Sequence, residues 1–284
     1  MSHIPVLLHE SIEGLAIKKG GTYVDCTVNR GGHSLLIAKA VGKKGMLICI
    51  DLDQDALREA KKNLSSLTNA PTLHFIHSNF RHLKEILKDK KIGKVDGVLA
   101  DLGISSQEFE ESGRGFSFQK DEPLHMTFHA KPTEDMTTAY DIVNSWSEST
   151  IADILYGFAD EVYSRRIAKA IIERRLQAPI RTTTELVEVI RKAVPGLYRH
   201  RKIHFATKTF QALRMATNDE LGSITDLIHA LPEVLAPSGR GAIITFHSTE
   251  DRLVKRSLRD LSDILLPITK KPIIPTFPEQ KQNS

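Results

Sequence analysis

Five short apolar runs along the chain have the length and composition of buried β-strands. They are Tyr23–Cys26, Met46–Ile50, Leu73–His77, Val95–Ala100 and Ala242–Phe246. Each of the first three leads into a segment whose apolar residues recur at helical spacing. Strands that alternate with helices are typical of a doubly wound parallel sheet. We therefore predict an α/β fold built on a Rossmann-like sheet.

The alternation of strands and helices stops after Asp101. From there to about Thr207 the sequence has only loop and helical patterns. One apolar stripe in this region has the i, i+3, i+4, i+7 spacing of a helix and consists of Ile151, Ile154, Leu155 and Phe158. Thr182 and Glu185 form the sequence pattern of a capping box, which opens a further helix. We predict that residues 105–207 form a helical domain inserted into the sheet domain.

The sheet pattern returns in the last third of the chain. A helix predicted over Phe210–Leu231 leads through a proline–glycine turn to the last strand. Residues 1–104 and 208–284 are therefore assigned to one sheet domain. The apolar residues 265–268 and 273–274 are expected to add a terminal hairpin to its sheet.

A glycine pair, Gly31 and Gly32, follows the first strand, and Asp51 ends the second strand about twenty residues later. Glycine lets the backbone N–H groups at a helix start approach an anionic ligand closely. The sequence has neither the dinucleotide-binding G-x-G-x-x-G nor a P-loop, so a ligand with a ribose and a carboxylate but no phosphate fits best. S-adenosylmethionine is such a ligand. An ordinary βα turn followed by a helix-capping acid is the alternative interpretation.

Ligands of open α/β sheets bind at the carboxyl ends of the strands. The polar or aromatic residues at these positions are Asp25, Thr27, Asp51, Asn79, Phe80, Asp101, His247 and Ser248. Phe80 is placed to stack on an adenine ring, or else belongs to the core. Asp101 ends the fourth strand, where amino-methylating enzymes keep the loop that faces the substrate.

The composition is that of a globular protein. The chain has 284 residues, of which 40% are hydrophobic and 26% charged. No apolar run approaches the roughly 18 residues that cross a bilayer, and the first five residues do not resemble a secretory signal. We therefore expect no membrane partner and a cytoplasmic location. Cys26 and Cys49 fall in predicted strands and are interpreted as small buried hydrophobic residues, so neither a disulfide nor a metal is expected.

Positive charge is concentrated in the predicted helical insertion. The whole chain has a net charge of only +4. The segment Arg165–Lys202, however, has eleven lysines and arginines against three glutamates. Such a surface suits the phosphates of a nucleic acid, although a solvated helical face gives the same pattern.

Several ordered motifs resemble those of the bacterial 16S ribosomal RNA cytosine-N4 methyltransferases, the MraW-like family. The matching segments are His3–Leu8, Arg30–Ser34, Asp101–Ser106, Arg114–Phe118, Ser164–Ile171, Thr207–Arg214 and Phe246–Arg252. They cover nearly the whole chain. The resemblance implies a class I S-adenosylmethionine methyltransferase that modifies a cytidine of the decoding region. Its partner would be 16S ribosomal RNA or the small ribosomal subunit.

The resemblance also implies roles for individual residues. The expected S-adenosylmethionine contacts are Gly31, Gly32, His33, Asp51, Phe80 and Asp101, with Glu108 in place of a cofactor-contacting glutamine. The expected RNA contacts are Arg165, Arg166, Arg174 and Arg175 in the helical insertion, and Lys208 just after it. From the chemistry, Asp101 is the candidate catalytic residue, because a carboxylate can accept a hydrogen bond from the cytosine amine during transfer. The hydroxyls of Ser105 and Ser106 are the weaker alternatives.

The chain departs from the family in a few places. Asn29 replaces a turn glycine, and His125, Thr127 and His129 stand where the family has Asp, Arg and Asp. The family's basic C-terminal tail is also missing from this sequence. A relative that binds cofactor and RNA without methylating therefore stays open as the alternative. A methyltransferase with another substrate is the third hypothesis.

Overall fold

The computed structural model describes residues 5–102, 112–129, 133, 136–276 and 279. The chain forms two compact units, Met1–Gly103 with Gly222–Ser284, and Ile104–Leu221. The second boundary differs from the predicted one at residues 207 and 208. Helix α11 (Thr207–Thr217) belongs to the second unit because it packs on helices of that unit and buries Phe210 and Leu213 in their core.

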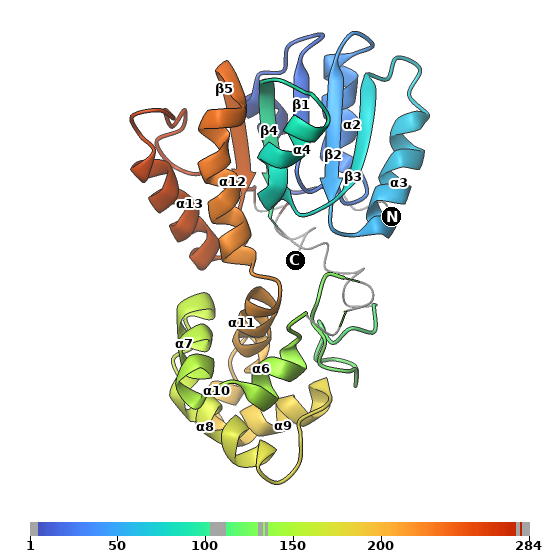
Figure 1. Ribbon diagram of the computed structural model, residues 1–284. Helices are drawn as coiled ribbons and strands as arrows, with labels where there is room; N and C mark the ends of the chain where they lie inside the picture. Colours follow the sequence, from blue (N-terminus) through green and yellow to red (C-terminus); the bar gives the residue numbers. More distant parts are fainter. Residues whose placement is uncertain (1–4, 103–111, 130–132, 134–135, 277–278, 280–284) are drawn as a thin grey trace. The chain divides into compact units, whose positions relative to one another are not determined.

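The first unit contains a five-stranded parallel sheet with the strand order β3-β2-β1-β4-β5 (Figure 1). The strands are β1 (Thr22–Asp25), β2 (Met46–Asp51), β3 (Thr72–His77), β4 (Val95–Asp101) and β5 (Leu235–Ile244). The predicted α/β fold with a Rossmann-like sheet is confirmed. All neighbouring strands run parallel, so their carboxyl ends meet along one edge of the sheet.

Helices cover both faces of this sheet. They are α1 (Leu8–Leu15), α2 (Gly32–Val41), α3 (Gln54–Ser65), η1 (Phe80–His82), α4 (Leu83–Asp89), α12 (Glu220–Val234) and α13 (Ser248–Asp260). Because side chains alternate along a strand, Val24 and Ile48 pack toward α4 and α12, while Tyr23 and Leu47 pack toward α1, α2 and α3. Cys26 and Cys49 are buried, as the sequence predicts, and both are free thiols.

The last strand begins earlier than predicted, at Leu235 instead of Ala242. Pro237, Ser238 and Gly239 were expected to form a turn before it. The pairing of β4 with β5 shifts in register between Val95 and Gly97, opposite this segment, and Ser238 has a φ of 62°. The turn is therefore present as an irregularity inside the strand.

Two further expectations at this end of the chain are wrong. The helix predicted over Phe210–Leu231 is interrupted, because Asp219 has a φ of 45° and separates α11 from α12. The terminal hairpin is not formed: residues 262–276 contain no strand. Leu266 in this segment is 83% exposed, so it adds nothing to the sheet core.

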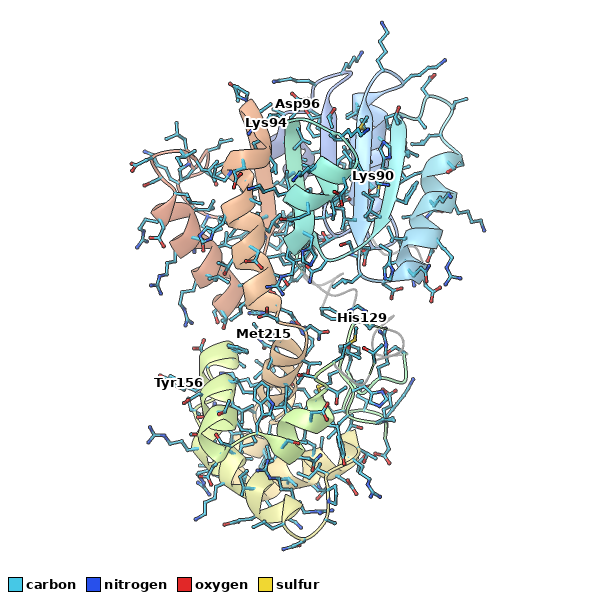
Figure 2. All side chains as sticks on the ribbon, viewed as in Figure 1. Lys90, Lys94, Asp96, His129, Tyr156 and Met215 are labelled. Carbon is cyan, nitrogen blue, oxygen red and sulfur yellow. The ribbon has the colours of Figure 1, made fainter. Side chains whose placement is uncertain are left out.

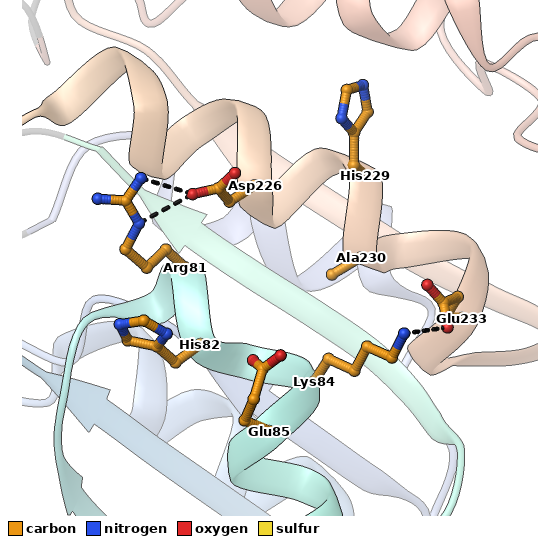
Figure 3. A pocket seen from close by; sticks show the side chains of 8 residues that line it. All are labelled: Arg81, His82, Lys84, Glu85, Asp226, His229, Ala230 and Glu233. Atoms are coloured by element: carbon orange, nitrogen blue, oxygen red, sulfur yellow. Dashed lines mark hydrogen bonds and ion pairs between the residues drawn. The ribbon is translucent and has the colours of Figure 1, made fainter.

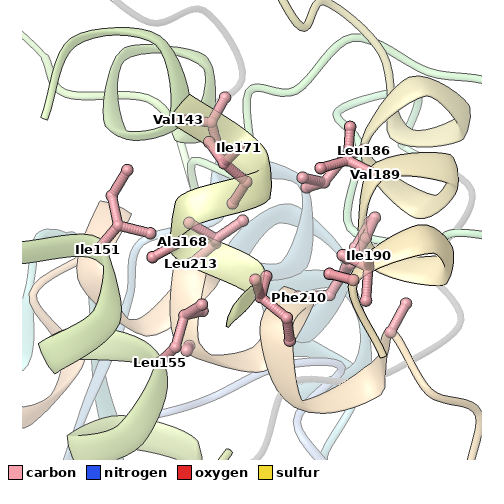
Figure 4. Close-up of a cluster of buried hydrophobic side chains, with 14 of the residues drawn as sticks. Val143, Ile151, Leu155, Ala168, Ile171, Leu186, Val189, Ile190, Phe210 and Leu213 are labelled. Carbon is pink, nitrogen blue, oxygen red and sulfur yellow. The ribbon is translucent and has the colours of Figure 1, made fainter. Parts of the chain in front are cut away.

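The second unit is helical. Besides α11 it contains α6 (Ala139–Ser145), α7 (Glu148–Ala159), α8 (Ser164–Arg175), α9 (Thr183–Ala193) and α10 (Gly196–Arg199). Their apolar faces enclose one core, in which Leu155, Ile171 and Leu213 are fully buried (Figure 4). Within the described ranges, the only β-pairing in this unit is an isolated bridge between Pro123 and Thr182.

At the amino ends of β1 and β4, charged side chains connect the two strands and the segment before β1. Asp96 lies near the start of β4 (Figure 2). Its carboxylate accepts the backbone N–H of Thr22 at 2.9 Å. Lys18 lies 3.8 Å from the same carboxylate. The predicted ligand-binding residues lie at the other end of the sheet, where the strands have their carboxyl ends. None of the helices in the described ranges is long and apolar enough to span a membrane.

Candidate active site

The chain reverses its direction of winding between β1 and β4. Strands β2 and β3 follow β1 on one side, and β4 and β5 lie on the other. This arrangement separates the loops after β1 and β4 at their carboxyl ends, and ligands of doubly wound sheets bind in the resulting crevice. Asp25 ends β1 and Asp101 ends β4, so two of the polar residues predicted at strand ends lie at this point.

Asp25 is fully buried and links β1 to α2. One carboxylate oxygen accepts the hydroxyl of Ser34 at 2.5 Å, and the other accepts the backbone N–H of Thr27 at 3.2 Å. Burial raises the pKa of Asp25 to about 6, although both hydrogen bonds act in the opposite direction. The residue fixes the start of α2 relative to the strand that precedes it.

Asp101 is held by its backbone and faces a buried histidine. Its N–H donates to the hydroxyl oxygen of Thr27 at 2.6 Å, and its Oδ2 lies 3.6 Å from Nδ1 of His33. The two side chains are nearly inaccessible, with residue exposures of 7% and 4%. Burial lowers the pKa of His33 to about 4, so its imidazole is neutral at pH 7. The contact is therefore not an ion pair, and 3.6 Å is too long for a hydrogen bond.

Asp51 is oriented by two backbone groups at the end of β2. Its carboxylate accepts the N–H of Asn29 at 2.8 Å and that of Asp53 at 2.9 Å. Burial raises the pKa of Asp51 to about 6. Since each carboxylate oxygen can accept a second hydrogen bond, the group can also bind an external hydroxyl.

The turn before α2 requires unusual backbone conformations. Asn29 has a φ of 47° and Gly31 a φ of 84°, and asparagine tolerates this region, as the sequence argument assumed. A side chain at Gly32 would place its Cβ 2.3 Å from Cγ of Pro5. The backbone conformation of Gly31 and the packing of Gly32 against Pro5 therefore each require glycine, independently of any ligand.

Further side chains lie just after the carboxyl ends of β3 and β5. Phe80 begins η1 and is partly buried against the core on the α4 side. The side chain of Asn79 caps this turn and donates to the hydroxyl of Ser223 at 3.1 Å. At the end of β5, the buried carboxylate of Glu250 accepts the N–H of Phe246 at 2.9 Å, which shapes the start of α13.

A separate hollow of about 340 Å³ lies between α4 and α12 (Figure 3). Arg81 pairs with Asp226 at 2.6 Å and Lys84 pairs with Glu233 at 2.5 Å across it. Exposed pairs of this kind contribute little stability. The hollow contains none of the predicted cofactor residues.

Comparison with known proteins identifies the family. The sequence model of the MraW methylase family matches residues 1–284. Proteins named ribosomal RNA small subunit methyltransferase H are 47% identical in Thermosipho africanus, 43% in Brevibacillus brevis and 42% in Clostridioides difficile. Each alignment covers 99% of this chain, with 93%, 93% and 94% of the relative. The chain belongs to the MraW methylase family. Its cofactor is S-adenosylmethionine.

The residues at the carboxyl ends of the strands of this MraW methylase suit that cofactor. Asp51 is a preoriented acceptor for a ribose diol, and the start of α2 after Gly31 offers backbone donors for a carboxylate. Of the six predicted contact residues, Gly31, Gly32, His33, Asp51 and Asp101 lie at the β1, β2 and β4 ends, and Phe80 at the β3 end. Contact with the cofactor stays a prediction for each of them. Glu108 lies outside the described residues.

Sequence reasoning missed the polar network that supports these residues. The Thr27–Asp101 and Asp25–Ser34 bonds were not expected, although Asp25 and Thr27 were recognised as lying at a strand end. A buried acid and a threonine at the end of an apolar strand are the available signal. Their partners cannot be predicted from local pattern, because the first bond joins residues 74 positions apart.

The predicted RNA-binding cations of this MraW methylase fall into two groups. Arg165 and Arg166 are exposed on α8. The other three bind backbone carbonyls of their own unit: Arg174 that of Ala178, Arg175 those of Val143 and Trp146, and Lys208 that of Asp160. These three cations therefore have a structural role that needs no RNA, because cations that bind the last carbonyls of a helix stabilise its C-terminus. RNA contact by any of the five stays a prediction.

Proposed function

We propose that this chain transfers the methyl group of S-adenosylmethionine to N4 of a cytidine in the decoding region of 16S ribosomal RNA, on the small ribosomal subunit. The observation that carries this proposal is the identity of 42–47% over 99% of the chain to ribosomal RNA small subunit methyltransferases H. A substrate of this kind would place the protein in the bacterial cytoplasm.

The chemistry demands a proton acceptor beside the reacting amine. S-adenosylmethionine supplies an electrophilic methyl group on a sulfonium. The amine nitrogen of cytosine is a weak nucleophile, because its lone pair is delocalised into the ring. A carboxylate that accepts an N4–H hydrogen bond localises this lone pair and takes the proton that the nitrogen loses. Asp101, nearly buried at the end of β4, is the residue we assign to this role.

His33 supports this assignment. Its imidazole is neutral at pH 7, because burial holds its pKa near 4. A cation beside Asp101 would lower the basicity of the carboxylate, whereas a neutral ring does not. The proton accepted by Asp101 would then pass to solvent after the product leaves.

Asp51 supports cofactor binding in the same scheme. Its carboxylate is fixed by the backbone of Asn29 and Asp53 before any ligand arrives. Preorganised acceptors lose little freedom when a ribose diol binds. The target base would have to leave its stack to reach Asp101, as bases do in other modifying enzymes.

Small ribosomal subunits from a strain that lacks the modification provide the test. The protein is incubated with these subunits and methyl-labelled S-adenosylmethionine, and the methylated nucleotide is mapped. We expect one N4-methylcytidine in the decoding region, formed much more slowly by the Asp101→Asn variant. Cofactor binding without methylated RNA would favour the non-methylating relative, and label in another molecule would favour a different substrate.

A further inference from the structure

Two tyrosines and two arginines of the second unit form one aromatic and cationic cluster. The rings of Tyr163 and Tyr198 meet edge to face, with their centres 4.9 Å apart and an angle of 77°. The guanidinium carbon of Arg166 lies 5.8 Å from the centre of the first ring, and that of Arg201 lies 4.8 Å from the second. We call these four residues the tyrosine–arginine surface.

A buried carboxylate anchors this surface. Glu161 is fully inaccessible, and it accepts the backbone N–H of Tyr163 at 2.8 Å and the hydroxyl of Tyr198 at 2.7 Å. It therefore ties the start of α8 to α10, two segments more than thirty residues apart. The rings, and through them the arginines, are held on a preformed support.

The charges of this surface are not neutralised locally. Within the described ranges, neither Arg166 nor Arg201 forms an ion pair. Four further exposed cations lie close to these arginines in the sequence: Arg165, Lys169, Arg199 and Lys202. Of these, Lys169 has a carboxylate 3.9 Å away, on Glu173. The first turn of α8 contains two arginines and no acidic residue. Positive charges at a helix N-terminus oppose the helix dipole, so helix stability does not explain these arginines.

Exposed apolar residues lie close to this surface in the sequence. Val162 directly precedes Tyr163 and is 65% exposed, and Leu197 directly precedes Tyr198 and is 90% exposed. Ile203, two residues after Arg201, is 63% exposed. Arginines that bind phosphates, next to apolar groups that contact sugars or unstacked bases, are typical of surfaces that bind single-stranded or looped RNA.

We propose that the tyrosine–arginine surface binds the sugar–phosphate backbone of the RNA substrate, with Arg166 and Arg201 contacting phosphates. The proposal rests on the function proposed above and adds where on the second unit the RNA is bound. It replaces three of the five cations that the sequence suggested, since Arg174, Arg175 and Lys208 bind backbone carbonyls. A guanidinium is planar, and its position over an aromatic ring restricts its orientation, which favours two-point contact with a phosphate.

Arg191 provides a matched control. It belongs to the same unit and also lies over an aromatic ring, 5.9 Å from the centre of Phe205. Unlike Arg166 and Arg201, it pairs with a carboxylate, that of Glu188 at 3.2 Å. Its charge is therefore already compensated, and its removal should affect RNA binding little.

The experiment measures binding of the full chain to unmodified small subunits and to polyuridylate over a salt series. The variants are Arg166→Ala with Arg201→Ala, the corresponding double lysine change, and Arg191→Ala. We expect the double alanine variant to bind both RNAs at least about tenfold more weakly and to lose roughly 1.4–1.8 from the salt slope, which corresponds to two phosphates. The lysine variant should keep the slope but bind more weakly, and Arg191→Ala should stay within about threefold of the parent.

The result separates this inference from the proposed function. Parental affinity and salt slope in a folded double alanine variant would overturn the surface, while methylation of the subunits would still support the function. Weakened RNA binding by the double variant, together with no methylation by the parent, would support the surface and contradict the function. An equal loss with Arg191→Ala would show that the whole charge matters and would overturn the assignment to these two arginines. Melting temperature and cofactor affinity check that each variant is folded.

Discussion

The hydroxyl oxygen of Thr27 accepts the backbone N–H of Asp101 at 2.6 Å and so joins the ends of β1 and β4. Because the bond uses the backbone of Asp101, its carboxylate can face His33 and a substrate. The two strands are neighbours in the sheet, with Asp25 opposite Leu99. Thr27 is therefore a positioning residue for the acid that we assign to proton acceptance.

The first prediction separates the carboxylate of Asp101 from its support. Asp101→Asn keeps the backbone bond but cannot take a proton, so methylation should fall by about 10²–10⁴-fold while cofactor affinity changes only a few-fold. Thr27→Val, which removes the bond and preserves volume, should have a smaller effect, and Thr27→Ser should resemble the parent. Single-turnover methylation and calorimetry measure the two quantities. Normal turnover by the Asn variant would remove Asp101 from the mechanism.

Cofactor affinity should depend on pH through Asp51. Its pKa is raised to about 6 by burial, and a protonated carboxyl has one acceptor less for a ribose diol. Affinity should be level above pH 7 and fall by up to about tenfold per unit below 6. Calorimetry between pH 5 and 7 measures this. In the Asp51→Asn variant the affinity should be lower and independent of pH; an unchanged slope would assign the titration to another group, such as Asp25.

Asp25 should make the first unit less stable as the pH rises. Its pKa is about 6 in the folded chain and about 4 when unfolded, so the folded state holds more protons between these values. The free energy of unfolding should therefore be highest below pH 4 with respect to this group and decrease by roughly 3 kcal/mol as the pH passes 6. Denaturant titrations of the parent and Asp25→Asn at pH 5 and 7 test this. The variant should lose part of the difference, and an equal difference in both proteins would contradict the prediction.

The sheet could be predicted because its strands carry their own pattern. The predicted starts and ends of β1 to β4 differ from the structure by no more than one residue. The pattern misled at the chain's end, where Pro237 and Gly239 interrupt a strand that nevertheless continues. It also missed the break at Asp219, because the cause is a distant contact: the side chain of Asn218 binds the backbone of Met126 and Phe128.

The positions of the acids in the fold could be predicted from the sequence, whereas the surroundings of the cations could not. Asp51 and Asp101 follow apolar strands, and strand ends meet at one edge. Arg166 and Arg175 look alike in the sequence, and charge counting assigns both to RNA. The structure distinguishes them, because the exposed guanidinium of Arg166 lies over the ring of Tyr163 and that of Arg175 binds the carbonyls of Val143 and Trp146.

This distinction gives a stability prediction for Arg175. Its guanidinium donates to Val143 at 3.0 Å and to Trp146 at 2.7 Å, at the C-terminus of α6. Arg175→Ala should lower the free energy of unfolding by about 1–3 kcal/mol, because the carbonyls lose a charged donor. Arg165→Ala, on the exposed side of α8, should stay within about 0.5 kcal/mol. Equal stability of the two variants in denaturant titrations would refute a capping role.

The last prediction concerns the loop in which His125, Thr127 and His129 replace two acids and an arginine of the family. Exchanging Thr127 for arginine, together with His125 for aspartate, is the obvious repair. The structure argues against it, because Thr127 is only 3% exposed and its hydroxyl accepts the N–H of His129 at 3.2 Å. Arg114 already donates to the carbonyls of Thr127 at 3.1 Å and Phe128 at 2.8 Å.

This loop is therefore held from outside by an arginine at another position in the sequence. The larger, charged side chain of Thr127→Arg would overpack a buried position and should cost about 1–3 kcal/mol of stability without raising the methylation rate. Arg114→Ala should disturb the loop more than Thr127→Ser, which keeps the hydroxyl. Denaturant titration and single-turnover methylation of the parent, these three variants and the His125→Asp and Thr127→Arg double variant provide the measurement. A stable His125→Asp and Thr127→Arg double variant that methylates faster than the parent would show that the missing pair, and not Arg114, is what the loop requires.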